Sequence, residues 1–190
     1  LNSFDIEITK VNGEPNNTTG VRRGTGNIIA LNSFAERTSV IEEFTGSWCG
    51  YCPRGTVGLS KLKAKYGDKI ITLAGHYGDP MECTPYYSFL AQNASGFPDA
   101  IYDRAYHADP YIGVNSSYSF GADAVVDMLK KVYPSEASLT IEAHWTDATK
   151  TAIDAKAYAT FLYSRSDENP YAVVFILTED GMTGTGSDWY

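Results

Sequence analysis

Two cysteines separated by two residues are the part of this sequence best suited to chemistry. They lie in the run WCGYCP at positions 48–53, between a predicted strand and a predicted helix. The unpaired N–H groups and the dipole at the start of a helix stabilise a thiolate, which lowers the pKa of a cysteine there. We therefore predict that Cys49 is the nucleophilic thiol. Cys52, further into the helix and more buried, would be the thiol that resolves a mixed disulfide.

Two other interpretations of this pair stay open, a zinc site and a static structural disulfide. Zinc usually takes four ligands, and only His76 and Cys83 could complete such a set here. The position between strand and helix favours redox chemistry over both. We expect no metal and no cofactor besides the Cys49–Cys52 disulfide itself. Cys83 is expected to be a small buried hydrophobic side chain and not a third redox centre.

The elements that must position the pair follow a strand–helix–strand order. A strand is predicted over 39–45 (SVIEEFT), a helix from Pro53 to Gly67, and a second strand over 69–74. Such a unit places its two strands parallel with a right-handed connection. Further along the chain, the pattern predicts a short helix over Thr84–Gln92, a strand over Ala100–Tyr102 and a helix over Phe120–Val132.

Several residues around the pair are candidates for contact with a substrate. Trp48, Gly50 and Tyr51 flank the two cysteines. His76, with Tyr77 and Asp79 behind it, follows the second parallel strand, and ligands bind at the carboxyl ends of such strands. We expect this end of the strand to share a rim with Cys49, although an ordinary loop surface is the alternative for each of these residues.

The hydrophobic period changes after Pro134. Alternating apolar and polar residues predict strands near 139–145 and 153–163, and an apolar run predicts a third over Tyr171–Thr178. Three strands leave one face uncovered, so this all-β, sandwich-like region looks incomplete, and a strand at Phe4–Val11 could join it. After the Phe4–Val11 strand, the sequence predicts a loop over 12–27 and a short strand over 28–31. We divide the chain into a segment 1–34, an α/β domain 35–134 and a β region 135–190.

The run 40–52, VIEEFTGSWCGYC, resembles the active-site strand and turn of the thioredoxin superfamily. The resemblance implies an α/β thioredoxin-like fold, a mixed sheet flanked by helices. It also implies that Pro98 is a cis-proline opposite the disulfide, with the backbone of Phe97 pairing with an extended substrate. Glu43 would be a buried acid that accepts the proton of Cys52. The alternatives are an ordinary turn proline, and a Glu43 that faces solvent while Glu42 faces inward or is itself exposed.

A more specific resemblance covers about residues 35–180. The runs 43–54 (EFTGSWCGYCPR), 78–81 (GDPM) and 96–99 (GFPD) are similar to those of bacterial outer-membrane lipoproteins that join a thioredoxin-like domain to a β-sandwich-like region. This implies export to the cell envelope, in the periplasm or at the outer-membrane surface, with membrane contact only through a lipid anchor outside this chain. The partners would be thiol- or disulfide-containing proteins and a redox partner. Tyr51 replaces the usual proline between the cysteines, so the direction of electron transfer stays open.

Composition excludes several classes of function. The 190 residues carry 15 basic and 23 acidic side chains, a formal net charge of −8, without a Lys/Arg cluster. Such a chain is a poor ligand for nucleic acid. No apolar run approaches the ~20 residues of a membrane-spanning helix.

The aromatic residues of the β region motivate a second hypothesis about function. The protein would be a cell-surface binding or adhesion module whose disulfide is structural and which catalyses no reaction.

Overall fold

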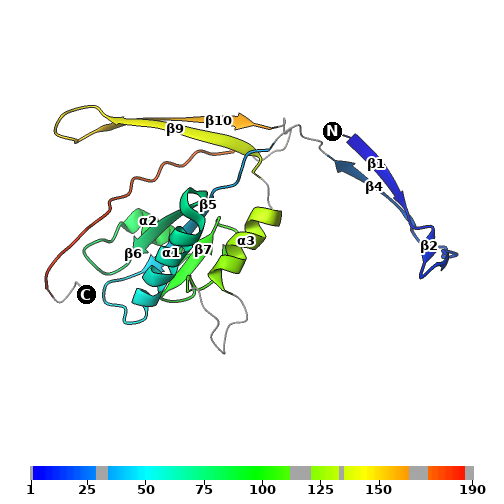
Figure 1. Cartoon of the computed structure of the whole chain (residues 1–190), viewed down its shortest axis with the longest axis horizontal. Helices are drawn as coiled ribbons and strands as arrows, with labels where there is room; N and C mark the ends of the chain where they lie inside the picture. The colour runs from blue at the N-terminus through cyan, green and yellow to red at the C-terminus, as the bar shows by residue number, and fades with distance from the viewer. Residues whose placement is uncertain (1, 29–33, 112–120, 133–134, 163–170, 187–190) are drawn as a thin grey trace.

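A four-stranded mixed sheet forms the centre of the protein (Figure 1). The computed structural model describes residues 2–28, 34–111, 121–132, 135–162 and 171–186. The sheet order is β6-β5-β7-β8, with bounds Ile70–His76, Ser39–Thr45, Asp99–Tyr102 and Tyr106–His107 respectively. Strands β5 and β6 are parallel, whereas β7 is antiparallel to both β5 and β8. The expected α/β architecture with a mixed sheet is therefore present.

Helices cover both faces of this sheet. Helix α1 (Cys52–Tyr66) links β5 to β6 through a 3-10 turn at Gly67–Lys69, and Pro53 lies in its first turn, where a missing N–H costs nothing. Gly67 ends the helix with φ = 58°. Helix α2 (Thr84–Ala91) precedes β7, and α3 (Ala122–Val132) follows β8. The predicted start of α3 at Phe120 lies outside the described residues.

The alternation of side chains along β5 assigns each face its helices. Ile41 packs with Leu62 of α1 and Val125 of α3 in the larger hydrophobic core. Phe44 points to the other face and packs with Leu90 of α2 in a second, smaller core. Because strands flank β5 on both sides and helices cover both its faces, six of its seven residues are buried.

The N-terminal segment forms hairpins that the sequence predicted only in part. Strand β1 (Asn2–Glu7) pairs antiparallel with β4 (Arg23–Ile28), and the two-residue strands β2 (Lys10–Val11) and β3 (Glu14–Pro15) pair at the far end. The single strand predicted over Phe4–Val11 is therefore interrupted. Much of the stretch predicted as a loop is strand, since β4 starts well before residue 28. Residues 29–31 of the predicted short strand lie outside the described part of the chain.

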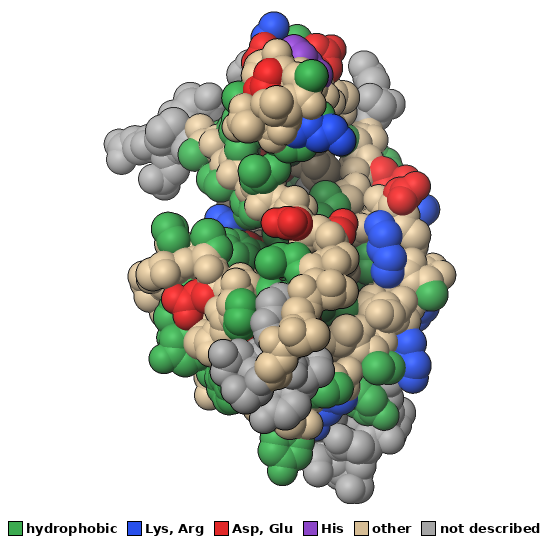
Figure 2. Space-filling model, turned by 90° about the vertical axis from the view of Figure 1, so that its left-hand side faces the viewer, with side chains coloured by type: hydrophobic (Ala, Val, Ile, Leu, Met, Phe, Trp, Pro, Cys, Tyr) green, Lys and Arg blue, Asp and Glu red, His purple; other side chains and the backbone are tan. Residues whose placement is uncertain are grey.

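Strands β9 (Ala137–Trp145) and β10 (Ile153–Phe161) form an antiparallel ribbon with one apolar face. On that face Leu139, Ile141 and Trp145 lie opposite Ala159, Ala157 and Ile153. The three larger side chains on β9 are 68%, 65% and 47% exposed. Figure 2 views the molecule from the side of the β9–β10 turn and shows hydrophobic side chains scattered among charged and polar ones. Among the described residues, β9 and β10 pair only with each other, so a sandwich remains a prediction.

The third strand predicted over Tyr171–Thr178 is wrong for this structure. These residues are described, and none of them belongs to a strand. Tyr171 packs against Phe161 at the end of β10, with 4.8 Å between ring centroids, and the chain then runs beside the α/β unit (Figure 1). Five consecutive apolar side chains from Val173 to Leu177 stay exposed. A β-prone run becomes a strand only where another strand supplies hydrogen-bond partners, and here no ladder forms.

Truncation of Leu62 tests the larger core. Leu62 is fully buried in α1, so Leu62→Ala should lower the free energy of unfolding by about 3 kcal/mol, through lost burial and a residual cavity. Val57 lies on the same helix but is half exposed, and Val57→Ala should cost less than about 1 kcal/mol. Urea unfolding followed by circular dichroism measures both. Equal losses in the two variants would contradict the packing described here.

Candidate functional site

Cys49 and Cys52 are joined by a disulfide at the start of α1. Their Cα atoms are 5.4 Å apart, and the N–H of Cys52 donates to the carbonyl oxygen of Cys49 at 3.2 Å. Cys49 is 7% exposed and Cys52 3%, so the order agrees with the prediction that Cys52 is the more buried. Gly50 and Tyr51 are exposed between them. The exposed surface next to the disulfide is therefore this turn.

Glu43 is a buried carboxyl that pairs with no positive charge among the described residues. It is 2% exposed, and its Oε1 atom has no hydrogen-bond partner in the described part of the chain. Burial, and then the negative charge of Asp109, raise the pKa of Glu43 to about 8. Asp109 itself pairs with Arg54, in the first turn of α1. At neutral pH the Glu43 carboxyl therefore holds its proton for most of the time, and it can release and recover it.

A glycine in α1 makes room for this carboxyl. A Cβ atom at Gly55 would collide with Oε1 of Glu43, so the carboxyl lies directly against the helix. Gly55 is three residues after Cys52, and residues at this spacing share a helix face. The topology thus places Glu43 beside the part of α1 that carries the second cysteine.

Glu42 is buried too, on the opposite face of β5. Its Oε1 accepts hydrogen bonds from the Tyr86 hydroxyl and from Nη2 of Arg104, both at 3.0 Å, and its Oε2 accepts from Nε of Arg104 at 2.9 Å. The alternatives that left Glu43 on the surface are therefore wrong. Both glutamates are inside, because β5 is covered on both faces. One is paired with a cation and the other is not.

The peptide bond between Phe97 and Pro98 is cis, which is the geometry that the thioredoxin resemblance implies at this position. Pro98 is buried, and the half-buried Phe97 ring belongs to an aromatic cluster beside the disulfide turn. Its centroid lies 4.2 Å from that of Phe44, 5.0 Å from Trp48 and 6.0 Å from Tyr77. The structure thus brings Trp48 and Phe97, two of the predicted substrate contacts, into one cluster.

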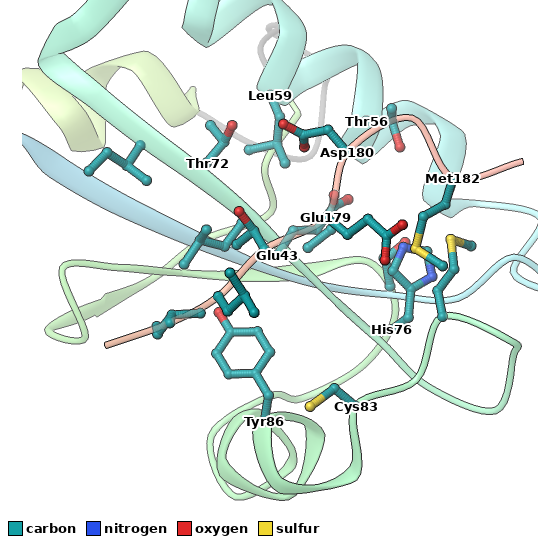
Figure 3. A pocket seen from close by; sticks show the side chains of 18 of the residues that line it. Glu43, Thr56, Leu59, Thr72, His76, Cys83, Tyr86, Glu179, Asp180 and Met182 are labelled. Carbon is teal, nitrogen blue, oxygen red and sulfur yellow. The ribbon is translucent and has the colours of Figure 1, made fainter. Parts of the chain in front are cut away.

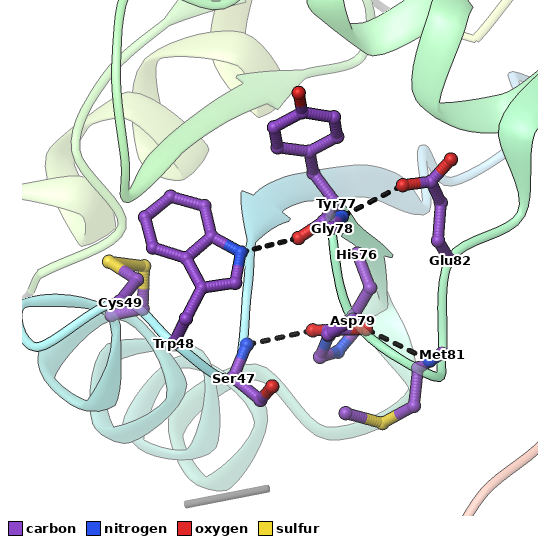
Figure 4. Close-up of polar contacts among 10 residues, drawn as sticks. Ser47, Trp48, Cys49, His76, Tyr77, Gly78, Asp79, Met81 and Glu82 are labelled. Carbon is purple, nitrogen blue, oxygen red and sulfur yellow. Dashed lines mark hydrogen bonds and ion pairs between the residues drawn. A yellow bond between two sulfur atoms is a disulfide. The ribbon is translucent and has the colours of Figure 1, made fainter. Parts of the chain in front are cut away.

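His76 ends β6 and is held by its neighbours. Its Nδ1 atom is 2.7 Å from Oδ2 of Asp79, and this carboxylate also accepts the backbone N–H of Ser47, two residues before Cys49 (Figure 4). The predicted rim at the carboxyl ends of β5 and β6 therefore exists. His76 belongs to this rim because it contacts Asp79, and Asp79 in turn contacts Ser47 in the turn before Cys49.

A broad cavity lies at the β6 edge of the sheet, lined by residues of both α1 and α2 (Figure 3). Glu43, Thr72 and His76 line it from the sheet, and Glu179 lines it from the C-terminal segment. Cys83 lines it as well, as an exposed free thiol. The expectation of a buried Cys83 is wrong, because this residue lies in the loop immediately before α2 and not in either core.

Within the described ranges, no group of three or more His, Cys, Asp or Glu side chains is placed to hold a metal ion. None of the described helices has the length and apolar character needed to cross a bilayer.

Sequence reasoning missed three groups of this site: Asp109, Asp79 as a ligand of the turn, and Glu42 as a buried ion pair. Asp109 lies in a loop after β8, and nothing in its local sequence indicates a neighbour in α1. The sequence indicates Asp79 only as a possible substrate contact. Adjacent glutamates in a strand with helices on both sides were the one available signal for Glu42, since consecutive strand residues point to opposite faces.

Comparisons with known proteins find solved structures of low similarity. A protein of Agrobacterium tumefaciens, AGR_C_4864, is 19% identical with a TM-score of 0.39, over 60% of this chain and 54% of that one. HBP35 of Porphyromonas gingivalis is 20% identical with a TM-score of 0.39, over 58% and 38%. The germline-specific thioredoxin Deadhead of Drosophila melanogaster is 19% identical with a TM-score of 0.31, over 51% and 82%. The chain thus spans about half the length of the Agrobacterium protein. No family model and no curated protein matches the chain.

The raised pKa of Glu43 predicts how stability depends on pH. The folded pKa is about 8 and the ordinary value 4.5, so its contribution is complete below about 4.5 and is lost as the pH rises through 8. Glu43→Gln should therefore flatten the decline of the unfolding free energy over this range. The difference amounts to a few kcal/mol, at about 1.4 kcal/mol per unit of pKa.

Urea unfolding of the oxidised protein at a series of pH values measures this effect. The matched control is Glu14→Gln, because Glu14 is an exposed glutamate in the N-terminal hairpin, and it should keep the wild-type dependence on pH. A Glu43→Gln variant with the wild-type dependence would show that this carboxyl is ionised like an exposed one.

Proposed function

We propose that the protein is a thiol–disulfide oxidoreductase of thioredoxin-like fold that acts on protein disulfides. The observation that carries the proposal is the disulfide at the N-terminus of α1 with the unpaired Glu43 carboxyl against the same helix. Burying a carboxyl without a partner lowers the stability of the fold, and a disulfide that serves only structure does not require an acid beside it. Strongly shifted acids in such places are typical of functional sites.

The exchange uses each of these groups in turn. The thiolate of reduced Cys49 attacks one sulfur of a substrate disulfide, which forms a mixed disulfide and releases the other substrate sulfur as a thiolate. Cys52 then loses its proton to Glu43, in the molecules in which this carboxyl has released its own proton to solvent, and attacks the sulfur of Cys49. This step releases the second substrate thiolate and closes the Cys49–Cys52 disulfide. The substrate gains two electrons and the protein loses two.

The reverse exchange oxidises a substrate dithiol by the same steps. A substrate thiolate attacks Cys49, and the leaving sulfur of Cys52 takes a proton from Glu43. Because the pKa of Glu43 is about 8, the carboxyl can act as acid in one direction and as base in the other near neutral pH. The relative reduction potentials of protein and substrate set the direction.

Contacts to the substrate would come from the exposed turn and the aromatic cluster. Gly50 and Tyr51 are exposed beside the disulfide, and Trp48 and Phe97 border it. We assign to Pro98 the position opposite the sulfurs and to the backbone of Phe97 the pairing with an extended substrate segment, on the resemblance to thioredoxins. His76 would act at the same rim, through its contact with Asp79.

The proposal extends to where the protein acts. By resemblance to bacterial outer-membrane lipoproteins, it would work in the cell envelope, attached through a lipid anchor outside this chain. Its partners would be envelope proteins with thiols or disulfides, and a second redox protein that restores its starting state.

A second candidate function has its own supporting observation. The apolar face of the β9–β10 ribbon is exposed, with Leu139, Ile141 and Trp145 on it, and such faces occur at recognition surfaces. A binding module with a structural disulfide would need a reduction potential below roughly −300 mV, whereas an exchange enzyme would fall between roughly −120 and −270 mV. Equilibration with glutathione and dithiothreitol separates the two.

Trapping of mixed disulfides tests the leading proposal. All variants carry Cys83→Ala, because the exposed Cys83 thiol would react on its own. The substrate is a disulfide-containing protein that has been reduced and then allowed to reoxidise. Cys52→Ser should accumulate mixed disulfides between Cys49 and this substrate, since the resolving thiol is absent. Non-reducing gels and mass spectrometry identify the linkage.

The double variant Cys49→Ser/Cys52→Ser is the control and should form no adduct. If the Cys52→Ser protein also forms none, and iodoacetamide modifies both thiols of the Cys83→Ala protein equally slowly near neutral pH, then the pair does not exchange disulfides and the proposal fails.

A further inference from the structure

Two hydrogen bonds join the turn before Cys49 to the loop after β6 (Figure 4). The backbone N–H of Ser47 donates to Oδ2 of Asp79 at 2.7 Å, and Nε1 of Trp48 donates to the carbonyl oxygen of Tyr77 at 2.6 Å. Within the turn, the N–H of Cys49 donates to the carbonyl oxygen of Gly46 at 3.0 Å. Ser47 and Trp48 are thus bonded to the loop after β6, and Gly46 is bonded to Cys49 within the turn.

The Asp79 carboxylate is the centre of this contact. Its side chain is fully buried, and its two oxygens have three partners: Oδ1 accepts the N–H of Met81 at 2.9 Å, and Oδ2 is shared by Ser47 and by Nδ1 of His76 at 2.7 Å. Burial raises the pKa of Asp79, but the hydrogen bonds from His76, Ser47 and Met81 outweigh it and hold that pKa below its ordinary value. The group is therefore a charged acceptor inside the protein, with His76 beside it.

The indole of Trp48 fits closely between two glycines. A Cβ atom at Gly46 would lie 2.7 Å from Nε1 of Trp48 and 3.0 Å from the Tyr77 carbonyl oxygen. Gly78 has φ = 67°, and a Cβ atom there would lie 3.2 Å from the same Nε1 atom. This close fit leaves the turn little freedom to move away from the loop after β6.

We propose that Asp79, oriented by His76, is a positioning residue for Cys49. It fixes the Gly46–Cys49 turn, and with it the alignment of the Cys49 sulfur with the N-terminus of α1, on which the stability of a thiolate there depends. Neither side chain needs to touch the substrate. This inference deepens the proposed function and rests on it, since a thiolate on Cys49 matters only if the pair exchanges.

The experiment measures the reactivity of Cys49 in variants that remove one contact at a time. In the Cys83→Ala background, Asp79→Ala removes the acceptor, Asp79→Asn keeps its shape with one oxygen fewer, and His76→Phe removes the group that orients it. His76→Asn keeps a donor near the place of Nδ1 and should restore most of the effect. Two readouts are taken: the pH profile of iodoacetamide alkylation of reduced Cys49, and the equilibrium constant of the pair with glutathione.

We expect Asp79→Ala to raise the apparent pKa in the alkylation profile and to change the glutathione equilibrium about three- to tenfold, with Asp79→Asn and His76→Phe in between. The matched control is Glu82→Gln. Glu82 accepts the N–H of Gly78 in the same loop, at 2.8 Å, but has no contact with the turn, so this variant should stay within about twofold of the parent.

Folding is checked by circular dichroism before either readout. If Asp79→Ala does not fold, Asp79→Asn and His76→Phe decide. Folded variants with the parental profile and equilibrium would overturn the inference. The proposed function fails separately: if the parent exchanges with no protein disulfide while the Asp79 variants still shift the alkylation profile, the positioning role holds and the enzyme does not.

Discussion

The burial of β5 on both faces is the constraint on which this structure depends. Adjacent residues in a strand point to opposite sides, so Glu42 and Glu43 enter two different interiors. Glu42 meets Arg104 and the Tyr86 hydroxyl and is stabilised as an ion. Glu43 meets the backbone of α1 at Gly55 and the charge of Asp109, and holds a proton instead. A single strand thus carries one structural carboxylate and one carboxyl suited to proton transfer.

The same strand delivers the chain to the start of α1, where backbone N–H groups are free to stabilise a thiolate. The turn between them is short, and its conformation is not determined by α1 alone. Asp79 and the Tyr77 carbonyl hold it from the next loop, so the sheet edge contributes to the geometry of the disulfide. The neighbouring strand therefore takes part in the site through hydrogen bonds to the backbone and to an indole, and not through a catalytic side chain.

Local patterns predicted the local parts of this site well. The cysteine pair, Pro53, the end of α1 at Gly67 and the parallel partner β6 all follow from residues near one another in sequence. What the sequence could not supply are contacts between distant loops. Asp109 meets Arg54 across 55 residues, and Asp79 meets Ser47 across 32. Asp109 lies in none of the runs that carry a resemblance, and the run 78–81 gives no indication that Asp79 contacts Ser47. A loop carboxylate is usually solvated, and this general expectation is wrong for both aspartates.

Glu43 and Asp109, the two acidic groups beside α1, also constrain the order of proton transfers in the proposed exchange. A thiolate on Cys49 and an ionised Glu43 would be two negative charges near one helix terminus, with Asp109 adding a third, and such charges disfavour one another. In the proposed exchange, Glu43 would therefore keep its proton while Cys49 carries the negative charge. Under the proposed function, formation of the mixed disulfide would remove the charge of Cys49, and Glu43 would then ionise more easily. Cys52 needs a base at this same step, so the reaction that consumes the Cys49 thiolate would also prepare Glu43 to accept the proton of Cys52.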